Sequence, residues 1–219
     1  MIEAVVFDLD GVLVDSEPVW EQVRRELVAE RGGHWAPYAQ RRLLGMSTPE
    51  WAAYLSRDLG VGLPPDQVAT LVIDRMTARY AEHVPLMDGA ADAVYRIAAR
   101  WPLGVASSSP PRLIETVLRS AGLRPCFSVV LSTEQVARGK PAPDIYLAVA
   151  AALGFPPGDC AAVEDSANGL RSAAAAGLRV IAIPQSRYPP APDALARASL
   201  VLPGLAGLTV DAVAALATS

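Results

Sequence analysis

The first apolar run of the chain ends in carboxylates. Residues 4–9 read AVVFDL and are followed by Asp10, so Asp8 and Asp10 stand among side chains that favour a buried strand. A buried carboxylate is costly unless it is paired with a cation or bound to a metal. The run therefore predicts a short buried strand over 4–9, at whose end two carboxylates meet positive charge.

Short apolar segments alternate with helical patterns through the later part of the chain. The apolar runs predict strands at 103–106, 127–131, 160–163, 180–183 and 199–202. The intervening segments predict helices that end next to a glycine at 112–120, 144–153 and 169–176, and a closing helix at 210–217. This alternation is typical of βαβ units. We therefore expect an α/β fold with a doubly wound parallel sheet, a Rossmann-like core that the first strand joins.

The segment between the first strand and this alternating region contains only helical patterns. Helices are expected at 17–32, 37–44, 48–59 and 65–82. A cap at Thr48, with Pro49 as the first helical residue, is expected to begin the third. We therefore expect a helical domain at 16–84, inserted into an α/β core formed by 1–15 and 85–219.

Composition and charge exclude several classes of partner. The chain has 219 residues, 52% of them hydrophobic, and a formal net charge of −4, which gives no basis for binding nucleic acid or an anionic membrane. No run of about 18 apolar residues indicates a membrane span, and no basic N-terminal segment indicates a signal peptide. The two cysteines, Cys126 and Cys160, are too few for a disulfide framework. We expect a cytoplasmic protein that is a monomer, with a dimer as the alternative.

Polar side chains follow four of the expected strands or lie in the loops beyond them. In an open parallel sheet, ligands bind beyond the carboxyl ends of the strands. The residues expected at that edge are Asp8, Asp10, Ser107, Ser108, Ser109, Lys140, Glu164, Asp165 and Asn168. Gly11 would permit the sharp turn that exposes the first two carboxylates.

The chemistry of these residues fits phosphoryl transfer. Four clustered carboxylates repel one another unless a cation lies between them, and Mg²⁺ prefers oxygen ligands of this kind. Lys140 and Ser107 suit phosphate oxygens, the first as a point charge and the second as a hydroxyl donor. Asp8 is a candidate nucleophile toward phosphorus, and Asp10 is a candidate proton donor and acceptor.

Four motifs together give the chain a family resemblance. It resembles the haloacid dehalogenase (HAD) superfamily, in the subfamily I branch of phosphatases and β-phosphoglucomutases that carry a small helical cap. The motifs are, in the order and spacing of the family, FDLDGVLVDSEP at 7–18, VASSS at 105–109, GKPAPDIY at 139–146 and VEDSANG at 163–169. The resemblance implies that the α/β core is catalytic and that the helical domain is a cap.

The resemblance also implies catalytic roles for individual residues. Asp8 would be the nucleophile, which carries the phosphoryl group as an aspartyl-phosphate, and Asp10 would be the general acid and base. Ser107, Lys140 and the backbone N–H of Ser108 would hold the phosphate.

The same resemblance implies a Mg²⁺ site. Asp8, the backbone carbonyl of Asp10 and Asp165 would ligate the ion, with Glu164 ligating it directly or through water. The resemblance also places Asp15 and Glu17 at the hinge of the cap and makes Asn168 a further candidate for the site. We expect Trp20 near the hinge as well, where it can face the substrate.

Two of the polar residues have a simpler interpretation. Ser109, in front of a Pro-Pro pair, is expected to cap the following helix. Asn168 either caps its helix or takes part in the site.

Departures from the family pattern reduce the number of reactions that the chain is expected to catalyse. Trp20 stands where the mutase branch has a histidine, and Thr48 stands where that branch has an arginine that grips a second phosphate. Asp10 argues against dehalogenation, because the dehalogenases lack the second aspartate. The block 16–84 contains no lysine, which argues against a Schiff-base mechanism from the cap.

The sequence therefore predicts a Mg²⁺-dependent phosphatase that acts on a small phosphomonoester, such as a sugar phosphate or similar metabolite, through a phosphoryl group on Asp8. The alternative is a sugar-phosphate mutase of the β-phosphoglucomutase type. A remote alternative is a non-enzymatic phospho-receiver. The substrate itself does not follow from the sequence.

Overall fold

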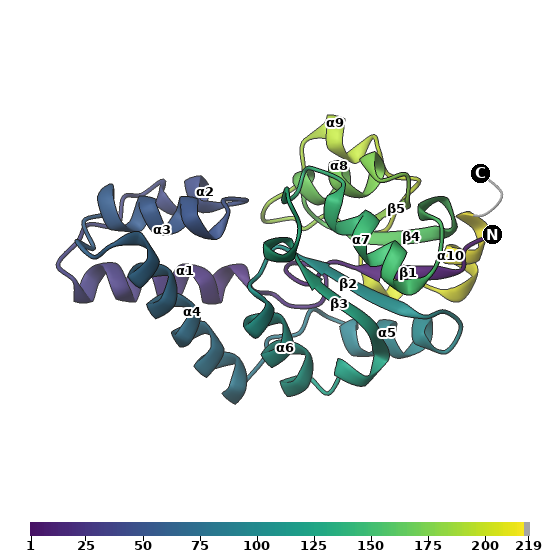
Figure 1. Cartoon of the computed structure of the whole chain (residues 1–219), viewed down its shortest axis with the longest axis horizontal. Helices are drawn as coiled ribbons and strands as arrows, with labels where there is room; N and C mark the ends of the chain where they lie inside the picture. The colour runs from purple at the N-terminus through teal and green to yellow at the C-terminus, as the bar shows by residue number, and fades with distance from the viewer. Residues whose placement is uncertain (217–219) are drawn as a thin grey trace. The chain divides into compact units, whose positions relative to one another are not determined.

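The chain divides into two compact units. The structure, a computed structural model, describes residues 1–216. One unit comprises Met1–Asp15 together with the chain from Val84 onward, and the other is Ser16–His83 (Figure 1). Ala217, the last residue of the expected closing helix, lies outside the described residues.

A parallel six-stranded sheet forms the centre of the first unit. Its strands lie in the order β3-β2-β1-β4-β5-β6 and all pair in parallel. Their bounds are Ala4–Phe7 (β1), Leu103–Ser107 (β2), Phe127–Ser132 (β3), Cys160–Glu164 (β4), Arg179–Ala182 (β5) and Leu200–Val201 (β6). The predicted fold class, an α/β fold built on a parallel sheet with a helical insertion, is confirmed.

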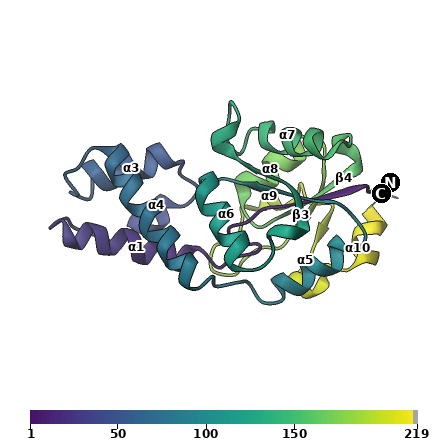
Figure 2. The ribbon, with the colours of Figure 1, turned by 60° about the horizontal axis from the view of Figure 1, so that its bottom comes forward.

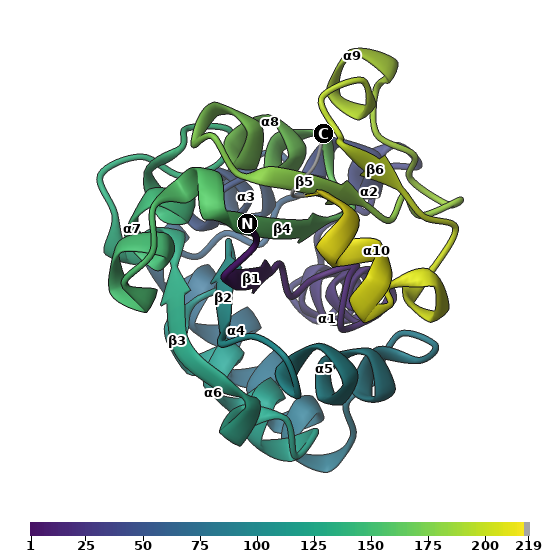
Figure 3. The same cartoon turned by 90° about the vertical axis from the view of Figure 1, so that its right-hand side faces the viewer.

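Helices cover both faces of this sheet (Figures 2 and 3). On one face lie α7 (Asp144–Leu153), α8 (Ala167–Ala175) and α9 (Pro192–Leu195), and on the other α5 (Ala90–Ala98), α6 (Pro111–Ser120) and α10 (Val210–Ala215). Because both faces are covered, the central strands are buried along their whole length rather than at alternate residues, as β1, β2 and β4 show. The core under α7 and α8 includes Val6, Ala106, Val149, Ala162 and Leu170.

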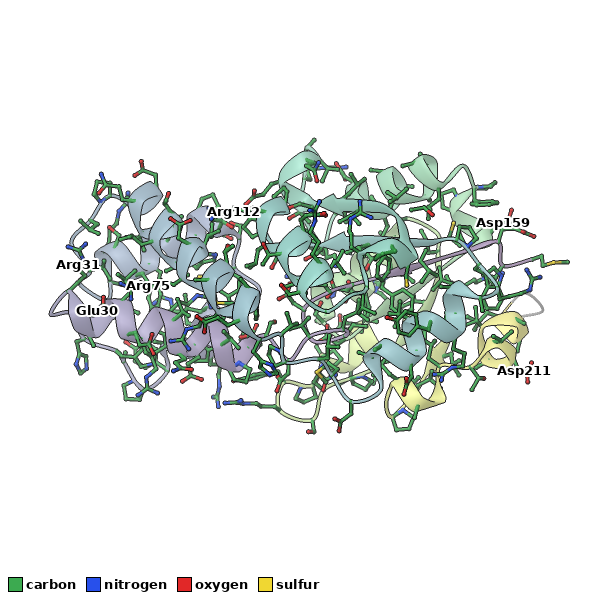
Figure 4. All side chains as sticks on the ribbon, turned by 90° about the horizontal axis from the view of Figure 1, so that it is seen from below. Glu30, Arg31, Arg75, Arg112, Asp159 and Asp211 are labelled. Carbon is green, nitrogen blue, oxygen red and sulfur yellow. The ribbon has the colours of Figure 1, made fainter. Side chains whose placement is uncertain are left out.

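The second unit is built from four helices, α1 (Glu17–Glu30), α2 (Ala39–Leu43), α3 (Thr48–Arg57) and α4 (Pro65–Glu82). Each of the longer helices buries one stripe of side chains, in α4 Val68, Val72, Met76 and Tyr80. On the outside, Arg75 of α4 pairs with Glu30 of α1 at 2.6 Å, and Figure 4 labels both residues. Such an exposed pair contributes little, so the buried stripes hold this unit together.

Several element boundaries differ from those expected. β1 ends at Phe7 rather than residue 9, because the chain bends at Leu9, and Asp10 instead forms an isolated bridge with Val14. α3 begins at Thr48, and Ser47 is its N-cap, whose N–H donates to the Glu50 carboxylate at 2.8 Å. The predicted cap at Thr48 was therefore one residue too late. The expected elements do not include α5, although its buried residues Ala90, Ala93, Val94 and Ile97 follow helical spacing, or α9, whose four residues are too few to show a period.

Across residues 1–216, no helix combines the length and the apolar character that crossing a membrane would require.

The contact between β2 and α7 generates a stability prediction. A Cβ on Gly104 of β2 would lie 2.5 Å from Val149 Cγ1 and 3.2 Å from Leu153 Cδ1 of α7. Gly104→Ala is expected to lower the free energy of unfolding by about 1–3 kcal/mol, because the helix must move to admit the methyl group. Denaturant unfolding measures this change. Gly158→Ala, where a Cβ meets open space, is the matched control and should change stability by less than about 0.5 kcal/mol. Equal stabilities for the two variants would contradict the packing argument.

Candidate active site

The site forms where the order of the sheet reverses. β1 and β4 are neighbours in register, with Phe7 opposite Val163, and the Asp8 N–H donates to the Val163 carbonyl at 3.0 Å. Asp8 and Glu164 therefore leave the sheet side by side, and Asp165 follows. In a doubly wound sheet this reversal is the place where ligands bind.

A tight turn after β1 brings the next residues back toward β4. Gly11 has φ +81°, and a Cβ there would collide with the Asp165 carboxylate. The turn that the sequence predicted at Gly11 is thus present, and the absence of a side chain also makes room for Asp165. Gln185, in the loop after β5, donates from Nε2 to the Gly11 carbonyl at 2.7 Å and fixes this turn.

Lys140 connects the carboxylates of both strands. Its Nζ donates to Asp8 Oδ1 at 2.7 Å, to Glu164 Oε1 at 2.6 Å and to the Ala106 carbonyl at 2.9 Å. The three donors of the ammonium are thereby used, and its side chain is only 5% exposed. Asp8 and Glu164 together outweigh the effect of burial, which alone would lower the pKa of Lys140, so its pKa is raised and it stays charged.

Glu164 is fully buried and surrounded by donors. Lys140 and the Tyr146 hydroxyl, at 2.6 Å, donate to Oε1. The backbone N–H of Asp165 and the N–H and hydroxyl of Ser166 donate to Oε2. Gly169 of α8 makes this possible, because a Cβ there would collide with the Glu164 carboxylate.

The three carboxylates Asp8, Glu164 and Asp165 form an acidic cluster. Each offers an oxygen, and these oxygens lie within 4.8 Å of one another. Asp165 Oδ1 is buried without a hydrogen-bond partner among the described residues. Three carboxylates around one ammonium leave excess negative charge, so the cluster and its unpartnered oxygen fit a divalent cation.

Burial and the neighbouring carboxylates disfavour ionisation of Asp8 and Asp165. Burial raises the pKa of Asp8 from 3.8 to about 8, against the opposing effect of Lys140, and the Glu164 and Asp10 carboxylates add to the rise. Burial, with the charges of Asp8 and Glu164, likewise raises the pKa of Asp165. Burial and Glu164 raise the pKa of the Tyr146 phenol, which keeps its proton.

Asp10 is held by the serines that follow β2. Ser109 Oγ donates to Asp10 Oδ2 at 2.8 Å and Ser107 Oγ at 3.3 Å. Ser109 is held in turn, because Ser132 Oγ donates to its carbonyl at 2.7 Å. The expectation that Ser109 caps α6 was wrong: the cap position is Pro110, and the buried hydroxyl of Ser109 turns toward the carboxylate.

Three further predicted residues, Ser108, Asn168 and Asp15, are wholly or partly exposed. Ser108 is exposed directly after β2. Asn168 is partly exposed within the first turn of α8, and Ser166 caps that helix by accepting from the Gly169 N–H, so the cap alternative for Asn168 was wrong. Asp15 is exposed, and its backbone N–H donates to the Pro85 carbonyl. A role for these residues in the site stays a prediction.

Two predicted residues belong to the helical unit. Glu17 accepts a hydrogen bond from Gln40 Nε2 at 2.8 Å. Trp20 is 7% exposed; its ring lies 5.9 Å from that of Trp51, and the guanidinium of Arg24 stacks 4.6 Å from its centroid. Trp20 is therefore packed in the interior of that unit, and its contact with a substrate stays a prediction.

Sequence reasoning missed three residues that shape the site, Tyr146, Gly169 and Gln185, and it placed Ser109 at the site edge but with a capping role. Tyr146 and Gly169 lie inside the motifs GKPAPDIY and VEDSANG, so their position in a motif was the available signal. Gln185 lies in a loop without a motif, and only the fold brings it to the turn at Gly11.

The raised pKa of Asp8 predicts how stability depends on pH. A carboxyl whose pKa is higher in the folded than in the unfolded state binds more protons when folded, so the free energy of unfolding falls as the pH rises from about 4 to about 8. Asp8→Asn removes this titration, and we expect the Tm of the metal-free variant to fall less between pH 5 and pH 8 than that of the wild type. Calorimetry in the presence of a chelator measures the difference. Parallel pH dependences for the two proteins would contradict the assignment.

Comparison with known proteins places this geometry in a family. The model of the haloacid dehalogenase-like hydrolases matches residues 2–177, which include all of the cluster residues. Hexitol phosphatase B of Escherichia coli is 35% identical over 189 residues, 84% of each chain.

Solved structures agree with this match. CbbY from Rhodobacter sphaeroides in complex with phosphate has a TM-score of 0.84 at 33% identity, covering 95% of this chain and 96% of that one. A variant of the same protein in complex with xylulose-(1,5)bisphosphate has a TM-score of 0.83 at 32% identity, covering 94% and 96%. The chain therefore belongs to the haloacid dehalogenase-like hydrolases, as a phosphatase of the subfamily with a helical cap.

Proposed function

We propose that the chain is a Mg²⁺-dependent phosphatase that hydrolyses a small phosphorylated sugar or similar metabolite, with the phosphoryl group carried on Asp8. The observation that supports this most directly is the buried Asp8 carboxylate, which the Lys140 ammonium holds at 2.7 Å. It lies beside an Asp165 oxygen that has no hydrogen-bond partner within residues 1–216. A nucleophile, a fixed positive charge and a cation site lie together there.

The residues that would hold Mg²⁺ are Asp8, Asp165 and the backbone carbonyl of Asp10, with Glu164 acting directly or through water. All of these donors are oxygens, which suits a hard cation better than a transition metal. When bound, Mg²⁺ would balance the charge of the cluster and of the phosphoryl oxygens.

In the first step, an oxygen of Asp8 attacks phosphorus and the bond from phosphorus to the ester oxygen breaks. Asp10 gives its proton to the departing oxygen, so that an alcohol leaves. Lys140, with Ser107 and the Ser108 N–H, holds the phosphoryl oxygens, because a fixed ammonium stabilises the charge that spreads over them.

In the second step, Asp10 takes a proton from a water molecule. The water oxygen forms a bond to phosphorus, the bond from phosphorus to Asp8 breaks, and inorganic phosphate is released. The hydroxyls of Ser107 and Ser109 orient Asp10 before the reaction, since both donate to its Oδ2.

The proposed class of substrate is based on the names and the bound ligands of the relatives. One is named for hexitol phosphates, and another has been crystallised with a pentulose bisphosphate. The domain roles predicted from sequence belong to the same proposal: 1–15 with 85–219 as the catalytic core, and 16–84 as a cap to which Glu17 and Trp20 contribute.

A sugar-phosphate mutase is the second candidate, because it shares the first half of the reaction. Trp20 and Thr48, in place of the histidine and the arginine of the mutase branch, favour the phosphatase. The phospho-receiver is set aside, because the chain belongs to a hydrolase family.

Replacing the nucleophile tests the proposal. Phosphate release from a panel of hexitol, hexose and pentulose phosphates should require Mg²⁺ in the wild type. Asp8→Asn should lower kcat by at least roughly a thousandfold, because the amide cannot form the phosphoryl intermediate. Arg138→Ala, which removes a side chain that pairs with Asp144 and is 70% exposed, is the matched control. Wild-type protein that releases no phosphate from any monoester would refute the phosphatase.

A second assay separates phosphatase from mutase. A β-hexose 1-phosphate is incubated with the enzyme and a catalytic amount of the hexose bisphosphate. Net release of phosphate is expected. Isomerisation of the hexose phosphate without net release would instead identify a mutase.

A further inference from the structure

Tyr146 lies beneath the site, in the first turn of α7. Its side chain is fully buried, and its hydroxyl donates to Glu164 Oε1 at 2.6 Å. The Lys140 ammonium lies 5.2 Å from the centroid of its ring. One side chain thus contacts both partners of the central ion pair, but it does not approach Asp8 itself within hydrogen-bond distance.

Glu164 acts on the site through other groups. Five donors bind its carboxylate, and the backbone of Gly169 in α8 packs directly against it. A carboxylate held so fully has a fixed position. It influences the reaction through Lys140, which it binds, and through the backbone of Asp165.

Lys140 is shared between two carboxylates at nearly equal distance, Glu164 Oε1 at 2.6 Å and Asp8 Oδ1 at 2.7 Å. The balance depends on how strongly each oxygen attracts the ammonium. A second donor on Glu164 Oε1 takes up part of its negative charge and weakens its attraction for Lys140. Without that donor, Lys140 would be the only donor to Oε1 and would pair more closely with Glu164.

We propose that Tyr146 is a positioning residue: its hydroxyl anchors Glu164, and thereby keeps the Lys140 ammonium directed toward Asp8 and the phosphoryl group. The inference rests on the proposed phosphatase function, because its effect is on transfer to Asp8. Replacing a residue that hydrogen-bonds to a functional side chain and so orients it typically lowers activity 10–100-fold.

Tyr146→Phe removes the hydroxyl and keeps the ring. With p-nitrophenyl phosphate and saturating Mg²⁺, we expect kcat to fall by about tenfold and KM to change by less than about twofold, because Lys140 matters most when charge spreads over the phosphoryl oxygens. Tyr80→Phe removes a hydroxyl from another fully buried tyrosine, in α4, and should leave both constants unchanged. A Tyr146→Phe enzyme with the wild-type kcat would overturn the inference, as would a change confined to KM.

A double-mutant cycle tests the route through Glu164. In a Glu164→Gln background, Tyr146→Phe should lower kcat by less than about twofold further, since its partner charge is already gone. A full additional tenfold loss would show that Tyr146 acts by another route, and would overturn the inference.

Thermal unfolding of the metal-free proteins provides a measure that does not depend on activity. The Tm shifts of Tyr146→Phe and Glu164→Gln should be non-additive, whereas those of Tyr80→Phe and Glu164→Gln should add. Additive shifts for the first pair would overturn the inference.

A second variant covers the case in which Tyr146→Phe does not fold. Ser166→Ala removes a donor to Glu164 Oε2 from an exposed residue and should lower kcat in the same direction; an unchanged kcat would then overturn the inference. If the wild type hydrolyses no monoester, the proposed function fails. If the wild type is active and Tyr146→Phe is equally active, only the positioning role fails.

Discussion

One buried ammonium among buried carboxylates holds together the edge of the sheet at which the candidate site lies. Lys140 joins Asp8 at the end of β1 to Glu164 at the end of β4, and its third donor reaches the carbonyl of Ala106 in β2. Three neighbouring strands are thus connected at their carboxyl ends by a single charge. The remaining negative charge is costly to bury, and a site that keeps such charge unbalanced is suited to a cation and to a substrate that brings phosphate.

The protein accommodates this cluster with small residues and backbone donors. Gly11 leaves space for Asp165, and Gly169 leaves space for Glu164. Tyr146 and the start of α8 supply donors to Glu164, so that its charge is fully hydrogen-bonded. The unpartnered oxygen of Asp165 is then the position at which the site is incomplete among the described residues.

Much of the site could be predicted from the sequence, because its residues lie within short motifs at the ends of apolar runs. Asp8, Lys140, Glu164 and Asp165 were each predicted there, and the structure brings all four together. The errors concerned which partner a side chain binds rather than where in the fold the residue lies. Ser109 was expected to cap a helix, and Asn168 was allowed the same role. A local pattern shows that a hydroxyl or an amide can cap, but not that a carboxylate 99 residues away competes for the hydroxyl.

The sequence by itself determined the fold class, the family and the residue types of the chemistry, since apolar periodicity and motif spacing are local properties of the chain. Only the tertiary structure decided which of those groups share a proton, a charge or a hydrogen bond. Tyr146 meets Glu164 across 18 residues and Lys140 meets Asp8 across 132, and no local pattern records such distances. The order of the strands brings these groups together, because parallel pairing of β1 with β4 places the ends of both strands at one edge.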